Sequence, residues 1–335
     1  MVIYKKQYVC YNNVMSTQER LAGYSSDFSP EVIDAVSESA DRQRQHSTYI
    51  EFLQSVGISE SRQRPLVDIK PNDFDEKLAL VMHLPMANPL DANQLYSIAT
   101  VAEHYPNRRI IANANPSGIG YGYNTLNKCQ RTAVAQGDFR PAVEGLVRYL
   151  DKEGIEKIDQ VGESYGSELV AATRGFGAFD IGSMVMIEPA SVKKRSVIEL
   201  ASDFKSSEKA LDDYVKANNN PNLIQARKDS ISNNNYAIGL GRLSNIATSR
   251  GLAKGKFKDN LEINLLEHDE AEVGIAWGSE SELSVDSIVL GIVHGLSRKF
   301  GEDRVRGLRL EGQKHALAND RALQSAIIAH FIGRE

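Results

Sequence analysis

The sequence predicts an α/β fold, with a mainly parallel twisted sheet, helices on both faces and a helical insertion. From about residue 66 onwards, short apolar runs alternate with longer amphipathic segments, a pattern typical of βαβ units. One apolar run ends directly in a glycine-bracketed turn, Gly162–Gly166, which opens a helix. The interval 191–270, in contrast, contains no clear strand. Together these observations indicate a strand–helix core interrupted by a helical segment.

Composition excludes several classes of protein. The 335 residues carry a net charge of −5, which argues against a nucleic-acid partner because nucleic-acid binders usually present a basic face. Cys10 and Cys129 are the two cysteines, too few for a disulfide framework and compatible with a reducing compartment. The longest apolar run, 78–87, contains His83 and Pro85 and is far shorter than the ~20 residues that span a bilayer. With no visible signal peptide, we expect a cytoplasmic protein without a membrane span.

Residues 1–65 are interpreted as an N-terminal helical extension. Ser29-Pro30-Glu31 is typical of a capped helix start with proline at the first helical position. The helical pattern continues through Tyr49 and Phe52 and stops at Gly57. No recognisable site lies in this segment.

The core is expected in two parts, 66–190 and 271–335. Its amphipathic helix at 141–150 has Val143, Leu146 and Leu150 on one face. Because the apolar runs are nearly continuous, we expect strands that are buried on both faces. These runs are 78–84, 109–113, 158–161, 183–187, 272–277 and 305–310.

The interval 191–270 is interpreted as a helical cap or lid. Helices are expected around 197–204, 208–215 and 237–246, separated by asparagine-rich loops. Long insertions in compact domains are often functional lids. The alternative is a solvated helical elaboration without a gating role.

The segment Gly162-Glu163-Ser164-Tyr165-Gly166 carries the chemistry. Its G-x-S-x-G pattern lies between an apolar strand and an amphipathic helix, the context of a nucleophile elbow. A sharp turn strains the central residue, and the flanking glycines remove side chains that would collide. Ser164 then lies at a helix N-terminus, where the dipole favours a developing anion. The alternative is a tight turn with an ordinary serine.

A serine needs a base to become a nucleophile, and His315 is the candidate. It follows the last predicted strand by five residues and precedes a helix with Asn319 and Asp320 as caps. The other histidines lack a comparable placement, and His330 falls within that helix. The alternative for His315 is a loop histidine without a role.

These features resemble those of the α/β-hydrolase superfamily of serine esterases, lipases and peptidases. The strand that ends in His83-Leu84-Pro85 is similar to the strand before the family's oxyanion loop, and residues 115–122 resemble its Pro-Gly-x-Gly loop. The resemblance covers residues 66–335. It implies an α/β-hydrolase fold with a cap domain and a Ser-His-acid catalytic triad built on Ser164 and His315.

The resemblance leaves the acid of the triad open. The family usually has it three residues after a glycine at the end of the penultimate strand, where this chain has Ser281 flanked by Glu280 and Glu282. Some lipases instead have an Asp-Pro-Ala sequence after the preceding strand, and here Glu188 begins Glu188-Pro189-Ala190. We therefore consider Glu188, with Glu282 or Glu280 as the alternative, or no functional acid.

The oxyanion hole implied by the resemblance is unusual. One donor would be the backbone N–H of Tyr165. The second normally comes from two residues beyond His83, which is Pro85, and proline has no N–H. Leu84 or Met86 would donate instead; loss of one donor can cost about 10²–10³ in rate.

The sequence therefore favours a serine hydrolase that acts on a small ester or related acyl substrate through an acyl-enzyme. A peptidase or acyltransferase on the same fold is a second possibility. The alternative from another class is a non-catalytic binding or assembly protein with a degraded site, supported by Pro85 and Ser281. No metal or organic cofactor is expected, because ligand spacings and phosphate-loop signatures are missing.

Overall fold

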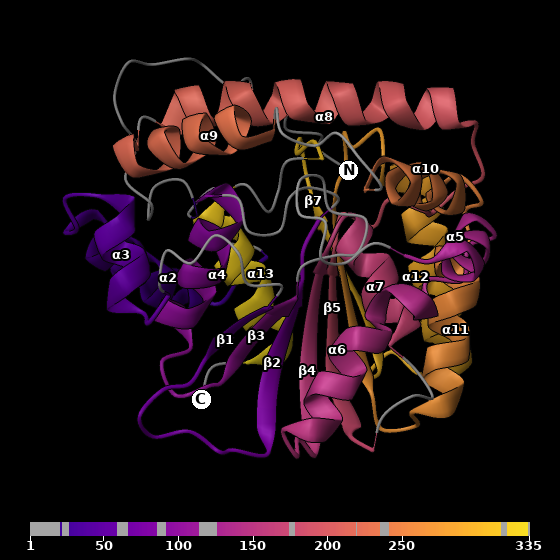
Figure 1. Ribbon diagram of the computed structural model, residues 1–335, viewed down its shortest axis with the longest axis horizontal. Coiled ribbons are helices and arrows are strands. Elements are labelled where there is room, and N and C mark those ends of the chain that lie inside the picture. The colour runs from indigo at the N-terminus through magenta and orange to yellow at the C-terminus, as the bar shows by residue number, and fades with distance from the viewer. Residues whose placement is uncertain are drawn as a thin grey trace.

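The computed structural model describes Leu21 and residues 27–58, 66–85, 92–113, 126–173, 178–218, 220–234, 241–315 and 320–333. Within them, a seven-stranded sheet has the order β1-β3-β2-β4-β5-β6-β7 (Figure 1). All neighbouring strands are parallel except β1, which pairs antiparallel with β3. The strands are β1 (Leu66–Ile69), β2 (Leu78–His83), β3 (Ile110–Asn113), β4 (Lys157–Glu163), β5 (Asp180–Ile187), β6 (Glu272–Gly278) and β7 (Val305–Leu310).

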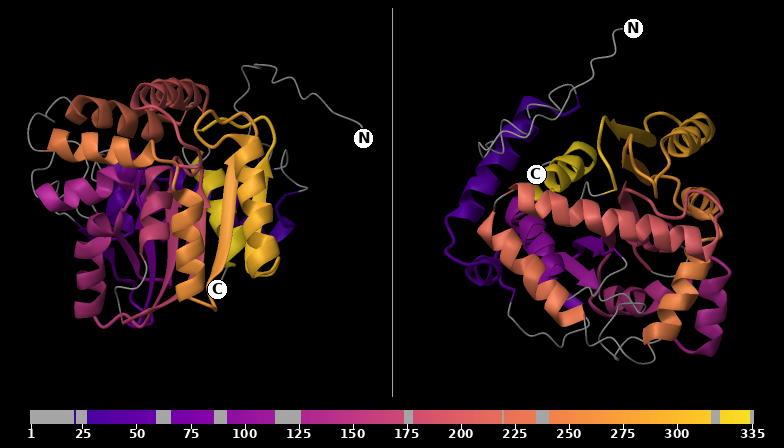
Figure 2. Two further views of the ribbon diagram at one scale, coloured as in Figure 1. Left: turned by 90° about the vertical axis from the view of Figure 1, so that its right-hand side faces the viewer. Right: turned by 90° about the horizontal axis from the view of Figure 1, so that it is seen from above.

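Helices cover both faces of this sheet (Figures 1 and 2). Those of the core are α4 (Ala92–His104), α5 (Lys128–Ala135), α6 (Arg140–Lys152), α7 (Tyr165–Ala172), α11 (Phe257–Glu267), α12 (Asp286–Phe300) and α13 (Arg321–Ile332). Helices α6, α7, α11 and α12 share one hydrophobic cluster with the sheet, and α4 and α13 share another. The sheet is therefore buried on both faces, as predicted.

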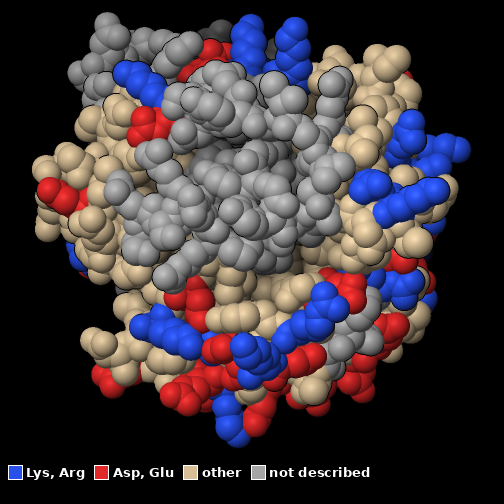
Figure 3. Space-filling view, viewed as in Figure 1, with Lys and Arg blue, Asp and Glu red and all other residues tan. Residues whose placement is uncertain are grey.

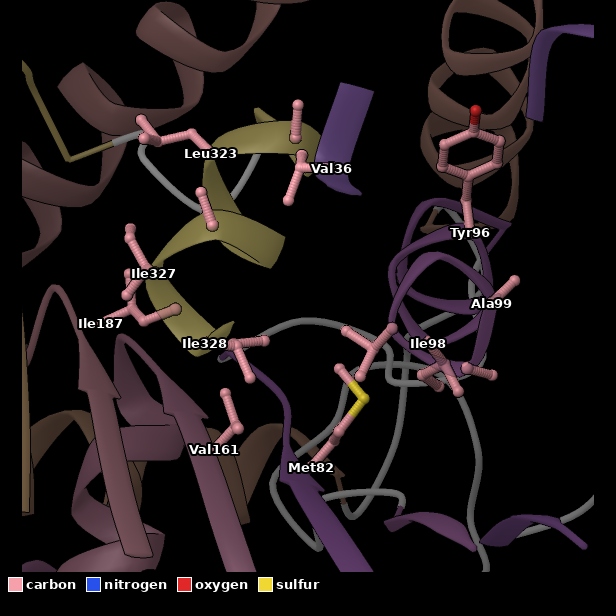
Figure 4. Close-up of a cluster of buried hydrophobic side chains, with 14 of the residues drawn as sticks. Val36, Met82, Tyr96, Ile98, Ala99, Val161, Ile187, Leu323, Ile327 and Ile328 are labelled. Carbon is pink, nitrogen blue, oxygen red and sulfur yellow. The ribbon is translucent and has the colours of Figure 1, made fainter. Parts of the chain in front are cut away.

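Alternation along the strands distributes the side chains between these two clusters. In β2, Leu80 and Met82 pack toward α4 and α13, whereas Val81 packs toward α6 and α7. Figure 4 shows part of the cluster that the sheet shares with α4 and α13, in which Ile327 and Ile328 lie close to the sheet.

Among its described residues, the N-terminal extension contains the helices α2 (Pro30–Arg44) and α3 (Tyr49–Ser55). The prediction of one continuous helical pattern was wrong, because Thr48 caps a new helix by accepting the N–H of Glu51. Both helices pack against α4, and α2 also packs against α13. Val36 and Phe52 join the α4–α13 cluster, so the extension adds a layer outside one face of the core.

The interval 191–270 holds α8 (Val197–Asn218), α9 (Pro221–Asn234), α10 (Gly241–Leu252) and α11. Helix α8 is continuous where two short helices were predicted, and α9 and α11 were not predicted. Residues 237–240 of the third predicted helix lie outside the described residues. Helices α8 and α9 extend across the sheet edge at which the strands end (Figures 1 and 2), whereas α11 packs beside α7 and α12.

Acidic and basic side chains are interspersed on the face of the molecule in Figure 3. Among the described residues, Arg108 forms an ion pair with Asp159, and Lys77 forms one with Glu156. In the described part of the chain, no helix combines the length and apolar character needed to cross a bilayer.

Candidate active site

The turn between β4 and α7 holds Ser164 in a strained conformation, with φ +53° and ψ −113°. Positive φ is uncommon for a residue with a side chain. The flanking glycines permit the turn: a Cβ atom on Gly162 would collide with the backbone of Gly166, and one on Gly166 with the carbonyl of His83. The N–H of Ser164 donates to the carbonyl oxygen of Ile187 at 2.8 Å, which fixes the turn to the end of β5.

The loop after β7 brings His315 to Ser164. Strand β7 ends at Leu310, and Gly312 turns the chain with φ +70°. His315 Nε2 lies 3.1 Å from Ser164 Oγ, and its side chain is 7% exposed. The two residues, 151 positions apart, are therefore at hydrogen-bond distance.

Glu188 occupies the other side of the imidazole. Its Oε2 lies 2.9 Å from His315 Nδ1, its side chain is 1% exposed, and its φ is +56°. Because a carboxylate accepts, the arrangement places the proton on Nδ1 and leaves Nε2 to accept from the hydroxyl of Ser164.

Glu280 and Glu282 lie elsewhere. Both residues are exposed, and Glu282 Oε1 accepts a hydrogen bond from Ser206 of α8 at 3.0 Å. The structure thus brings Glu188, rather than either alternative, to His315.

Two further groups bind Glu188 from the end of β6 and the loop that follows it. The N–H of Gly278 donates to Oε1 at 2.6 Å, and the hydroxyl of Ser281 donates to Oε2 at 2.6 Å. Sequence reasoning treated Ser281 as a missing acid and did not foresee these contacts. The three-residue spacing of Ser281 and Ser284 could have predicted a local serine turn. In the structure, the N–H of Ser284 donates to Ser281 Oγ at 3.0 Å.

Burial changes the charge state of groups around the turn. It raises the pKa of Glu163, next to Ser164, although the nearby Arg321 and His315 lower it. It raises the pKa of Glu168 in α7 to about 8 and lowers the pKa of His83 to about 4, against the effect of the Gln160 hydrogen bond. In each case burial shifts the pKa in the direction that favours the neutral form.

Tyr165 and Leu84, the expected oxyanion donors, belong to segments that meet at the turn. Tyr165 is the first residue of α7, and Leu84 directly follows β2. The backbone of Gly166 lies so close to the His83 carbonyl that a Cβ atom there would collide with it, so the two segments approach each other at this point. Met86 and residues 115–122 lie outside the described residues. Within the described part, no group of three or more His, Cys, Asp or Glu side chains is arranged to hold a metal.

Similarities to solved structures agree with this architecture. E-2-(acetamidomethylene)succinate hydrolase matches with a TM-score of 0.53 and 17% identity, over 80% of this chain and 94% of that one. The esterase EaEST from Exiguobacterium antarcticum matches with a TM-score of 0.50 and 12% identity, over 78% of this chain and 91% of that one. The chain has the α/β-hydrolase fold.

Sequence comparison adds nothing to this structural match. No protein-family model matches the chain, and a search of curated proteins finds no significant match. At 12–17% identity, the similarity establishes the fold, and function has to be argued from the site.

Proposed function

We propose that this α/β-hydrolase-fold protein is a serine hydrolase that cleaves a small ester or related acyl substrate. The observation that supports the proposal best is the continuous hydrogen-bond chain from Ser164 through His315 to Glu188, with distances of 3.1 and 2.9 Å. Its members come from the ends of three strands, β4, β5 and β7. The strained backbone at Ser164 and at Glu188 is of the kind that clusters at functional sites.

In the proposed reaction, Ser164 Oγ attacks the acyl carbon while His315 Nε2 takes the hydroxyl proton. His315 then donates this proton to the leaving alcohol, and the acyl group stays on Ser164 as an ester. A water molecule attacks this ester with His315 again as the base. The acid product leaves and Ser164 regains its proton. Glu188 orients the imidazole and stabilises its charged form.

The developing oxyanion would be stabilised at the start of α7. The N–H groups of Tyr165 and Leu84 are the proposed donors, and the helix N-terminus adds positive potential there. Pro85 supplies no N–H, so this hole depends on Leu84 where the family usually uses the next residue.

The substrate is proposed to be small. Ser164 is 4% exposed, and α8 and α9 extend across the sheet edge near it (Figure 2). We propose that residues 191–270 include a cap over the site. The two similar structures are named as an esterase and as E-2-(acetamidomethylene)succinate hydrolase, so both names describe hydrolysis.

Labelling by a fluorophosphonate probe tests this function, because the probe reports an activated serine. We expect wild-type protein to be labelled and to hydrolyse short p-nitrophenyl esters, and Ser164→Ala and His315→Ala to lose both. The two variants should lose similar amounts of activity because Ser164 and His315 act as a unit. The free energy of unfolding of Ser164→Ala should stay within about 1 kcal/mol of the wild-type value, as for most small local changes.

An unlabelled wild-type protein that binds acyl compounds without turnover would contradict the proposal. It would favour the non-catalytic binding protein, the function that Pro85 favours.

A further inference from the structure

Ser281 lies where three polar groups of the site converge. Its Oγ is 2.6 Å from Glu188 Oε2, 3.5 Å from His315 Nδ1 and 3.0 Å from the N–H of Ser284. The residue is 6% exposed, so water competes little for these contacts.

The hydrogen atoms in this cluster can be assigned by elimination. The Ser284 N–H donates to Ser281 Oγ, and the ionised Glu188 carboxylate has no hydrogen to give. The hydroxyl hydrogen of Ser281 therefore points to Glu188 Oε2. That oxygen accepts from both Ser281 and His315, while Oε1 accepts from Gly278. Three donors together fix the plane of the carboxylate.

Such restraint matters because the Glu188 side chain is long and starts from an unusual backbone position. A glutamate loses substantial rotamer freedom when it is fixed, and φ at this residue is +56°. The restraint comes from the neighbouring loop: Ser281 and Gly278 hold the carboxylate, and the Ser284 hydroxyl donates to the Pro189 carbonyl at 2.9 Å. The two loops are thus joined on both sides of the carboxylate.

We propose that Ser281 is a positioning residue that holds the Glu188 carboxylate in the orientation that His315 requires. The inference rests on the proposed hydrolase function. The hydroxyl touches no reacting atom, and it acts through Glu188 by restricting its rotation and sharing its charge. Pre-organisation of this kind is what an outer hydrogen bond adds to a catalytic group.

Kinetics of Ser281→Ala and Ser281→Thr, with p-nitrophenyl acetate as the substrate, test this role. We expect Ser281→Ala to lower kcat about 10- to 100-fold, the range for one hydrogen bond to a charged group, with KM within about twofold. Ser281→Thr keeps the hydroxyl and should restore most of kcat. The matched control is Ser206→Ala, which also removes a serine hydrogen bond to a glutamate of this loop, Glu282, and should leave kcat unchanged.

A second readout does not depend on turnover. The His315 Nδ1 proton, hydrogen-bonded to a carboxylate, is expected to give a low-field NMR signal. We expect Ser281→Ala to shift or broaden this signal and Ser206→Ala to leave it in place. An unchanged signal together with a kcat within twofold of wild type would overturn the proposal. So would a loss of kcat that Ser281→Thr does not restore while the signal stays unchanged.

The two proposals fail in distinguishable ways. If wild-type protein is neither labelled by fluorophosphonate nor active, the hydrolase function fails. The NMR comparison then still decides whether Ser281 positions the pair, because it measures the hydrogen bond itself.

Discussion

Two loops at the carboxyl edge of the sheet, after β5 and after β6, contribute differently to the surroundings of His315. The loop after β5 carries Glu188 on a strained backbone, with φ +56°, and buries its carboxylate. The loop after β6 directs Glu280 and Glu282 to the surface and presents neutral donors, the Gly278 N–H and the Ser281 hydroxyl, to the same carboxylate. The carboxylate of the proposed triad and the groups that orient it therefore come from the ends of different strands, β5 and β6. In the proposed triad, one loop supplies the acid and the other supplies groups that position it.

Among the carboxylates of the two loops, only that of Glu188 should have a large effect on kcat. Glu188→Gln should lower kcat by about 10³–10⁴, as loss of the charge behind a catalytic histidine does, because glutamine keeps the shape without the charge. Glu280→Gln and Glu282→Gln should leave kcat within about twofold, since exposed substitutions have small effects. The measurement is kcat for all three variants under identical conditions. Wild-type rates in Glu188→Gln would mean that Ser164 and His315 act as a dyad.

A second prediction concerns Glu168, which binds the backbone of the Glu188 loop at Ser191. The N–H of Ser191 donates to Oε1 of the buried Glu168 at 3.2 Å, and burial raises the pKa of Glu168 from 4.5 to about 8. Between these values the folded protein keeps a proton that the unfolded chain releases. The free energy of unfolding should therefore fall as pH rises through this window, by about 1.4 kcal/mol per pH unit. Glu168→Gln should remove this contribution.

Urea unfolding of wild type and Glu168→Gln at pH 5, 6.5 and 8 checks the slope. His83 contributes an opposite slope, because its lowered pKa destabilises the folded state as pH falls from 6.5 toward about 4. Both proteins share that contribution, so it cancels in the difference. The surface variant Glu280→Gln is the control. Parallel pH profiles of wild type and Glu168→Gln would contradict a buried neutral Glu168.

A smaller gain in kcat is expected if an acid on the loop after β6 can replace Glu188. Ser281 Oγ is already 3.5 Å from His315 Nδ1, and an aspartate there would extend one atom further. Adding Ser281→Asp to Glu188→Gln should recover about tenfold in kcat over Glu188→Gln alone, a gain equivalent to about 1.4 kcal/mol. A double variant no faster than Glu188→Gln would show that the second loop has lost the geometry for an acid.

Much of the core was predictable because its strands are buried. The runs that became β2 to β7 are apolar enough to stand out, and the elbow at Ser164 and the loop at His315 have fixed places relative to those strands. Strand β1 was missed because it is a four-residue edge strand whose Asp68 pairs with Arg109, so it lacks the apolar signal.

The acid could not be chosen from the sequence for a different reason. Glu188 and Glu282 both follow strands that end at the same edge, and the choice depends on backbone angles and side-chain directions within two short loops. The positive φ at Glu188 and the hydrogen bond from Ser206 to Glu282 settle their positions, and neither is encoded by residue spacing. The break between α2 and α3 is similar, since it depends on a local cap at Thr48.

The packing of the N-terminal extension has a consequence for how the chain is made. Helix α2 ends at residue 44, yet it packs against α13, which begins at residue 321 and is therefore synthesised much later. At about 5–20 residues per second, roughly a quarter of a minute to a minute passes between the synthesis of the two helices. Throughout that time Val36, buried in the finished protein, has no α13 to pack against. Tyr49 of α3 likewise lacks its hydrogen-bond partner, Asp229 of α9, until that residue is synthesised 180 positions later. The apolar face of α2 should therefore stay without this partner in the nascent chain until α13 has been synthesised.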